Sequence, residues 1–140
     1  LHPSHCLKDE CCHTVSDRNR NCYRAQAFAT TRALTERLKV DRKKITLSFQ
    51  SRLGRRPWIK PYTDVVVDEL AAKGVRRLLV SCPSFVADCL ETLEEVQIRL
   101  AEQFAEKGGQ LKMVPALNDD DYWVQAFRKM VLRSDLEWTN

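Results

Sequence analysis

The sequence lacks the features of several large protein classes. No apolar run approaches the ~20 residues of a transmembrane helix, and the first residues show no signal-peptide pattern. No G-x-G-x-x-G or Walker sequence is present, which argues against a nucleotide site. The net charge is only +4 and the basic clusters are short or have acidic neighbours, which argues against a nucleic-acid partner. An initiator Met is also missing, so we expect a piece of a longer protein.

The composition is typical of a soluble globular domain, with 140 residues, 44% hydrophobic and 30% charged. Helical spacing of apolar residues predicts helices over residues 23–39, 65–72, 88–107 and 121–132, and β-rich runs predict strands over 45–50, 77–82 and 110–115. This alternation predicts an α/β fold, a parallel sheet with helices on both faces. Ligands of such sheets bind beyond the carboxyl ends of the strands.

Four of the six cysteines lie in the first 22 residues: Cys6, Cys11, Cys12 and Cys22. Disulfides need a secreted context, so this group is better interpreted as a metal site. Four thiolates suit an iron–sulfur cluster or structural zinc. The spacing contains no C-x-x-C pair, which disfavours a zinc ribbon, and unliganded thiols remain the alternative. Cys82 and Cys89 lie far away in an apolar context.

The loop after the first expected strand carries polar and aromatic side chains. Arg52 is suited to pairing with a carboxylate, and Trp58 offers a flat apolar face to a ring system. The alternative is that Trp58 packs over the sheet edge and Arg52 holds the loop.

Glu91 and Glu95 are four residues apart, so they share one face of the expected long helix. Two such carboxylates can bind a cation in turn, or one can accept protons that the other relays. A purely structural alternative also fits. Asp88 with Glu91 has the D-x-x-E form of a capping box, and Glu95 with Arg99 is an ordinary i,i+4 pair.

Two segments resemble signature motifs of the ferrochelatase family. Residues 50–64 are similar to Q-S-R/K-x-G-x-x-P-W-I/L-x-P-x-T-D, and residues 85–95 to F-x-x-D-x-I/L-E-T-L-x-E. Their order, and the later run Ala116-Leu117-Asn118, also match. The resemblance implies the C-terminal half of such an enzyme, with a three-layer Rossmann-like, chelatase-like fold. We expect a cysteine-rich insert over residues 1–22, the α/β domain over 23–133 and a tail over 134–140.

The resemblance implies insertion of ferrous iron into protoporphyrin IX or coproporphyrin in haem biosynthesis, a lyase activity. Glu91 is then the carboxylate at the metal-insertion centre, where the substrate iron enters, and Glu95 continues the acidic line. The substrate-binding residues implied are Trp58, Gln50, Ser51, Arg52, Asp88 and Cys89. The early cysteines resemble the insert of a bacterial subgroup in which Cys6, Cys11, Cys12 and Cys22 would hold a 2Fe–2S cluster.

The chain departs from the family pattern at three points. The catalytic His of the family is expected in an N-terminal half of the same enzyme, so this piece alone is expected to be inactive. Cys89 stands where many members have His, and Arg99 where a third acid is expected. The expected location is cytoplasmic, with peripheral attachment to the inner membrane left open. Two alternatives remain: another tetrapyrrole chelatase, or a cysteine-cluster binding module on an α/β domain.

Overall fold

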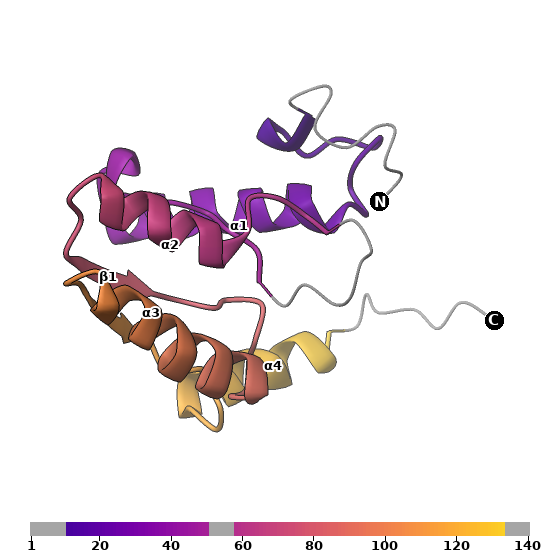
Figure 1. The fold of residues 1–140 in the computed structure, drawn as a ribbon. Coiled ribbons are helices and arrows are strands. Elements are labelled where there is room, and N and C mark those ends of the chain that lie inside the picture. Colours follow the sequence, from indigo (N-terminus) through magenta and orange to yellow (C-terminus); the bar gives the residue numbers. More distant parts are fainter. Residues whose placement is uncertain (1–10, 51–57, 134–140) are drawn as a thin grey trace. The chain divides into compact units, whose positions relative to one another are not determined.

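A computed structural model describes residues 11–50 and 58–133, which belong to two compact units, Leu1–Lys73 and Gly74–Asn140 (Figure 1). Within these described ranges, no helix is both long and apolar enough to cross a membrane. The expected tail over 134–140 lies outside the described residues.

The first unit is mainly helical. It contains the 3-10 turn η1 (Cys11–His13), the helix α1 (Tyr23–Leu38), a second 3-10 turn η2 (Arg42–Lys44) and the helix α2 (Thr63–Ala72). The prediction of α1 from its apolar spacing is confirmed to within a residue. The helix ends because Lys39 adopts a left-handed conformation, φ 53°.

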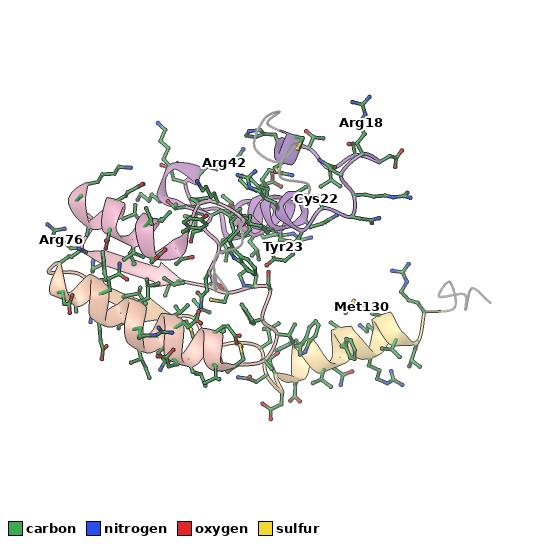
Figure 2. All side chains as sticks on the ribbon, turned by 45° about the vertical axis from the view of Figure 1, so that its right-hand side comes forward. Arg18, Cys22, Tyr23, Arg42, Arg76 and Met130 are labelled. Carbon is green, nitrogen blue, oxygen red and sulfur yellow. The ribbon has the colours of Figure 1, made fainter. Side chains whose placement is uncertain are left out.

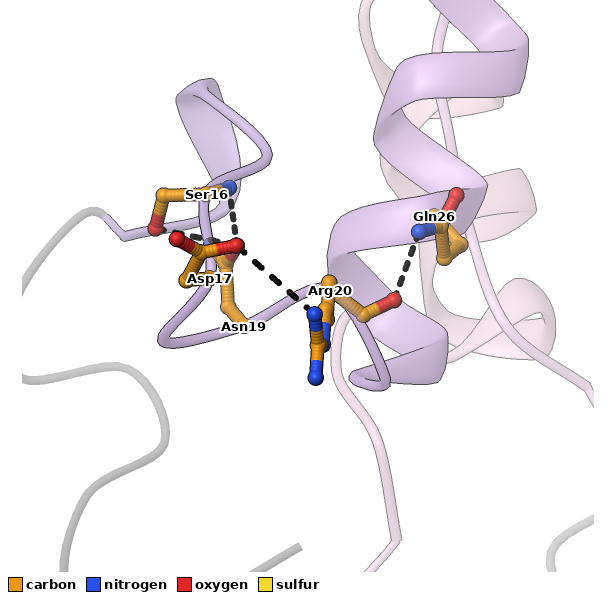
Figure 3. Close-up of polar contacts among 5 residues, drawn as sticks. All are labelled: Ser16, Asp17, Asn19, Arg20 and Gln26. Atoms are coloured by element: carbon orange, nitrogen blue, oxygen red, sulfur yellow. Dashed lines mark hydrogen bonds and ion pairs between the residues drawn. The ribbon is translucent and has the colours of Figure 1, made fainter.

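The loop between η1 and α1 is held by the buried side chain of Asn19 (Figure 3). Its amide donates to the carbonyls of Cys11 and Thr14, and its oxygen accepts from the Ser16 N–H at 2.7 Å. Gln26, in the first turns of α1, donates to the Arg20 carbonyl at 2.7 Å (Figure 3). This polar bracing compensates for the small apolar content of the loop.

The prediction of a strand over residues 45–50 is wrong about its length. Only Phe49 pairs, through an isolated parallel bridge to Tyr62. Its N–H donates to the Pro61 carbonyl at 2.8 Å, and its carbonyl accepts from the Thr63 N–H at 3.0 Å. A β-rich run forms a ladder only beside a second extended backbone. In the described part of the unit, the short segment around Tyr62 is the only such partner for residues 45–50.

The second unit has the predicted parallel pairing. Strands β1 (Arg77–Val80) and β2 (Gln110–Met113) align Arg77 with Gln110 and Val80 with Met113. The long connection between them packs along β2 and buries Val96, Leu100 and Phe104. The α/β class with a parallel sheet is therefore confirmed, and a helical layer on the second face stays a prediction.

The connecting helix differs from the regular α-helix predicted over residues 88–107. Its first ten residues, η3 (Glu91–Leu100), form a π-helix that continues into α3 (Ala101–Glu106). A π-helix uses i→i+5 hydrogen bonds, is rare and is frequent at functional sites. The helix ends at Gly108, φ 77°, where the N–H groups of Gly108 and Gly109 bond to the carbonyls of Ala105 and Phe104. This is a Schellman motif.

The last helix, α4 (Asp121–Val131), follows β2 after a short loop. The Asp120 side chain accepts from the N–H groups of Tyr122 and Trp123. Asp120 is therefore the N-cap of α4, and the helix predicted over residues 121–132 is confirmed to within a residue.

Candidate functional site

A hydrogen-bonded cluster joins the segment before η3 to the loop after β2. The Asn118 amide donates to the Asp88 carboxylate at 2.9 Å, while its oxygen accepts from the Asp88 N–H at 2.9 Å. The other carboxylate oxygen of Asp88 accepts from the Thr92 hydroxyl at 3.0 Å, and that hydroxyl accepts from the Cys89 N–H at 2.9 Å. Thr92 is 1% exposed, so this cluster continues into the core.

This geometry replaces the capping box that the sequence suggested. In a capping box the Glu side chain bonds back to the N–H of the capping residue. Here the Asp88 N–H bonds to Asn118 instead, and the Asp88 carboxylate accepts from the side chains of Thr92 and Asn118. Glu91, the first residue of η3, therefore has no capping-box geometry with Asp88.

The electrostatics of the cluster keep its carboxylates charged. The Cys89 side chain hydrogen-bonds to Glu91 and, with a backbone hydrogen bond, lowers the pKa of Glu91 despite desolvation. The pKa of Asp88 is lowered mainly by the Asn118 side chain, with Thr92 and the backbone at Ala116 adding to the effect. The pKa of the Cys82 thiol is raised by burial and by the nearby Cys89 and Asp88. The cluster thus combines two stabilised anions with a neutral thiol.

The acidic side chains along the helix are Glu91, Glu94 and Glu95, and Arg99 contacts the last two. Arg99 pairs with both carboxylate oxygens of Glu94, its Nε at 2.7 Å and its Nη2 at 2.8 Å, and lies 3.8 Å from Glu95. The predicted Glu95–Arg99 pair is present, but the shorter contact is to Glu94. In a π-helix, residues five apart are linked by the backbone bonds and can meet, which explains this partner.

Trp58 and Gln50 come together in the first unit. The indole N–H of Trp58 donates to the Gln50 carbonyl at 2.9 Å, which fixes the ring while leaving the side chain 39% exposed. An anchored, partly exposed aromatic face is suited to stacking against a flat ligand. The other two residues predicted for this loop, Ser51 and Arg52, lie outside the described residues.

The early cysteines are only partly described, because Cys6 lies outside the described residues. Cys22 immediately precedes α1 (Figure 2), and Cys12 is buried, with its sulfur accepting a hydrogen bond from Arg24 at 2.9 Å. Arg24 also donates to the Lys60 carbonyl at 3.1 Å, which connects the cysteine loop to the segment before α2. Over residues 11–50 and 58–133, no three His, Cys, Asp or Glu residues are gathered to hold a metal. Thiolates suit an iron–sulfur cluster, and a cluster held by Cys6, Cys11, Cys12 and Cys22 stays a prediction.

The sequence interpretation missed the roles of Thr92 and Asn118. Both are polar residues beside a predicted helix start or strand end, where side chains commonly bond to the backbone. Asn118 carries a further signal, since it adopts a left-handed conformation, φ 49°, that Asn accepts more readily than most residues. The π-helix itself has no sequence signature that periodicity could reveal.

Comparison with known proteins gives one consistent result. The family profile described as Ferrochelatase matches residues 7–135. The chain is 52% identical over 134 residues to the ferrochelatase of Pseudomonas syringae pv. syringae, covering 94% of this chain and 39% of that protein. It is 51% identical over 138 residues to the ferrochelatase of Ectopseudomonas mendocina, covering 96% and 41%. It is 47% identical over 134 residues to that of Legionella pneumophila strain Lens, covering 94% and 40%.

The chain therefore spans about two fifths of the length of these curated relatives. The match covers both units, including the Asp88–Glu91 segment and the loop that carries Asn118. A match of this extent and identity, on a chain with the parallel strands and the acidic π-helix described above, shows that the chain belongs to the ferrochelatase family.

Proposed function

We propose that this chain is part of a ferrochelatase that inserts ferrous iron into a porphyrin, protoporphyrin IX or coproporphyrin. Beyond family membership, one observation carries the proposal: Glu91 lies in the first turn of a π-helix and its pKa is lowered by a hydrogen bond from the Cys89 side chain. The hydrogen bonds between Asp88 and Asn118 hold the segment just before it. Because the chain spans about two fifths of its relatives, we propose that an N-terminal part of the same protein completes the site and supplies the catalytic His.

The protein must perform two functions for iron to be inserted. A divalent cation must be held beside the macrocycle, and two pyrrole protons must be accepted as it enters. A lowered pKa keeps Glu91 charged and makes it a weaker proton acceptor. Glu91 is therefore better suited to stabilising the incoming Fe²⁺. The His of the N-terminal part is suited to accepting the protons, and Glu95 to relaying them.

The remaining predicted residues have supporting roles in this proposal. Trp58 offers its fixed, partly exposed ring to the porphyrin face, next to Gln50. Ser51 and Arg52, which follow Gln50 in the sequence, are proposed to contact the porphyrin as well. Asp88 and Cys89 hold the start of the helix and the Glu91 carboxylate. Distortion of the bound macrocycle would expose its nitrogen lone pairs to the metal.

The test is Glu91→Gln in the full-length protein, assayed by single-turnover metalloporphyrin formation. Gln preserves size but offers no negative charge, so we expect a ~10²–10³-fold loss of rate, the usual effect of removing one group that stabilises charge in the transition state. Porphyrin binding, followed by fluorescence quenching, should change little. Glu95→Gln should be milder, since water can replace a relay one turn away.

Glu102→Gln is the matched control, because Glu102 is exposed on α3, farther along the same helix. It should keep the full rate. An unchanged rate in Glu91→Gln, or an equal loss in the control, contradicts the role of Glu91. Faster insertion of Co²⁺ than of Fe²⁺ by the wild type would instead favour another tetrapyrrole chelatase.

A 2Fe–2S cluster held by Cys6, Cys11, Cys12 and Cys22 is a second part of the proposal. Its support is the family resemblance, four thiols within residues 6–22 and an Arg24 hydrogen bond to the Cys12 sulfur, a contact that commonly tunes such clusters. We assign it no step in the reaction. Anaerobically prepared protein should contain iron and sulfide and lose its colour when any of the four becomes Ser, whereas Cys82→Ser should retain it. Equimolar zinc without iron or sulfide would contradict the cluster.

The proposed location is the cytoplasm, with peripheral attachment to the inner membrane. Cell fractionation tests this: full-length protein should leave the membrane fraction in high salt without detergent.

A further inference from the structure

The hydrogen bonds between Asn118 and Asp88 connect two segments that are 30 residues apart in the sequence. Asn118 makes three bonds to this partner segment: its amide donates to the Asp88 carboxylate, its oxygen accepts from the Asp88 N–H, and its own N–H donates to the Val86 carbonyl at 2.9 Å. The orientation of the amide is unambiguous, since one end faces a carboxylate and the other an N–H.

The connection continues directly to the start of η3. Asp88 accepts from the buried Thr92 hydroxyl, which accepts from the Cys89 N–H, and the Cys89 side chain hydrogen-bonds to Glu91. Three hydrogen bonds therefore lead from Asp88, the partner of Asn118, to Glu91. A displacement of Asp88 would be transmitted to the start of η3 through the buried Thr92, the residue next to Glu91.

We propose that Asn118 is a positioning residue that sets the place of Glu91 through Asp88, Thr92 and Cys89. This inference rests on the proposed function of Glu91. Asn118 acts on Glu91 through Asp88 and Thr92, so its effect is expected on the rate of the bound complex rather than on porphyrin affinity.

Two substitutions in the full-length enzyme separate positioning from folding. Asn118→Gly removes the amide without backbone strain, because Gly adopts the positive φ of this position freely. We expect kcat to fall about 5- to 100-fold with KM for porphyrin nearly unchanged, since a ~1 Å misplacement of a reacting group can cost ~10²-fold.

Asn118→Asp gives a readout that a structural role would not produce. It places two carboxylates face to face, which raises the pKa of one of them. Lowering the pH then supplies a shared proton that restores a donor to Asp88. The rate of this variant relative to wild type should therefore rise as the pH falls, whereas the relative rate of Asn118→Gly should stay flat.

The Cys82 thiol, which lies near Asp88, does not produce the pH dependence expected for Asn118→Asp. Cys82 has a raised pKa and stays neutral as the pH falls. Asp120→Ala is the matched control, because it removes two hydrogen bonds from the cap of α4. It should lower stability and leave kcat unchanged.

The outcomes are distinguishable. A wild-type enzyme that forms no metalloporphyrin would overturn the proposed function itself. An active wild type with an equally active Asn118→Gly, a flat pH ratio for Asn118→Asp, or an equal loss of kcat in Asp120→Ala would overturn the positioning role alone.

Discussion

Gly109 lies against the most deeply buried aromatic ring in the described part of the second unit, that of Phe104. A Cβ built on Gly109 would lie 2.5 and 2.6 Å from Cδ1 and Cζ of Phe104, and closer still to Cε1. Phe104 is 0% exposed, so its ring has no space to move aside. Gly109→Ala should therefore destabilise this unit by about 1–3 kcal/mol, the usual cost of overpacking.

Two comparisons isolate the steric term. Gly108→Ala adds a Cβ with no heavy atom within 4 Å, so it carries only the strain of its positive φ, about 1–2 kcal/mol. Phe104→Ala alone should cost about 3–5 kcal/mol, because it leaves a cavity. In that background Gly109→Ala meets no ring and its cost should fall close to zero, while the cost of Gly108→Ala should not change.

The assay is urea unfolding of the wild type, the three single variants and the two double variants, followed by circular dichroism, with the coupling energies taken from the double-mutant cycles. A coupling above about 1 kcal/mol between positions 104 and 109 is expected. If Gly109→Ala costs the same in both backgrounds within about 0.5 kcal/mol, the ring contact does not explain why this position is Gly.

Three further outcomes are expected. Lys39→Gly should raise the free energy of unfolding by about 1 kcal/mol, since Lys39 holds a left-handed φ of 53° at the end of α1. Thermal unfolding measures this change, and an unchanged stability would show that Lys39 is not strained. The pKa of Asp88 is lowered in the folded state, so its stabilising contribution is present above the unfolded value of about 3.9 and is lost as the pH falls through the folded pKa. Carbon-detected NMR titration should show this lowered pKa, and Asn118→Gly should raise it; an unchanged value would refute the link. Arg99→Ala should change stability by less than about 1 kcal/mol, because both Arg99 and Glu94 are solvent-exposed. Chemical unfolding at low and high salt checks this, and a larger, salt-independent loss would contradict it.

Local elements were predictable where one stretch of chain contains its own signals. The helix over 23–38 follows from apolar spacing, the end at Gly108 from the freedom of glycine at positive φ, and the start of α4 from an Asp cap. Glu91 was also a candidate from sequence, because its motif and spacing lie within eleven residues.

What the sequence by itself determined is therefore the order and type of most elements, the parallel pairing and the identity of the acidic residues. Tertiary structure decided the rest. The run around Phe49 became a single bridge because strand formation depends on a partner that local sequence does not specify. The capping box at Asp88 was replaced because Asn118, 30 residues away, offers both a donor and an acceptor to the same residue. Hydrogen bonds between distant segments depend on which backbones the fold brings together, and no local pattern encodes that.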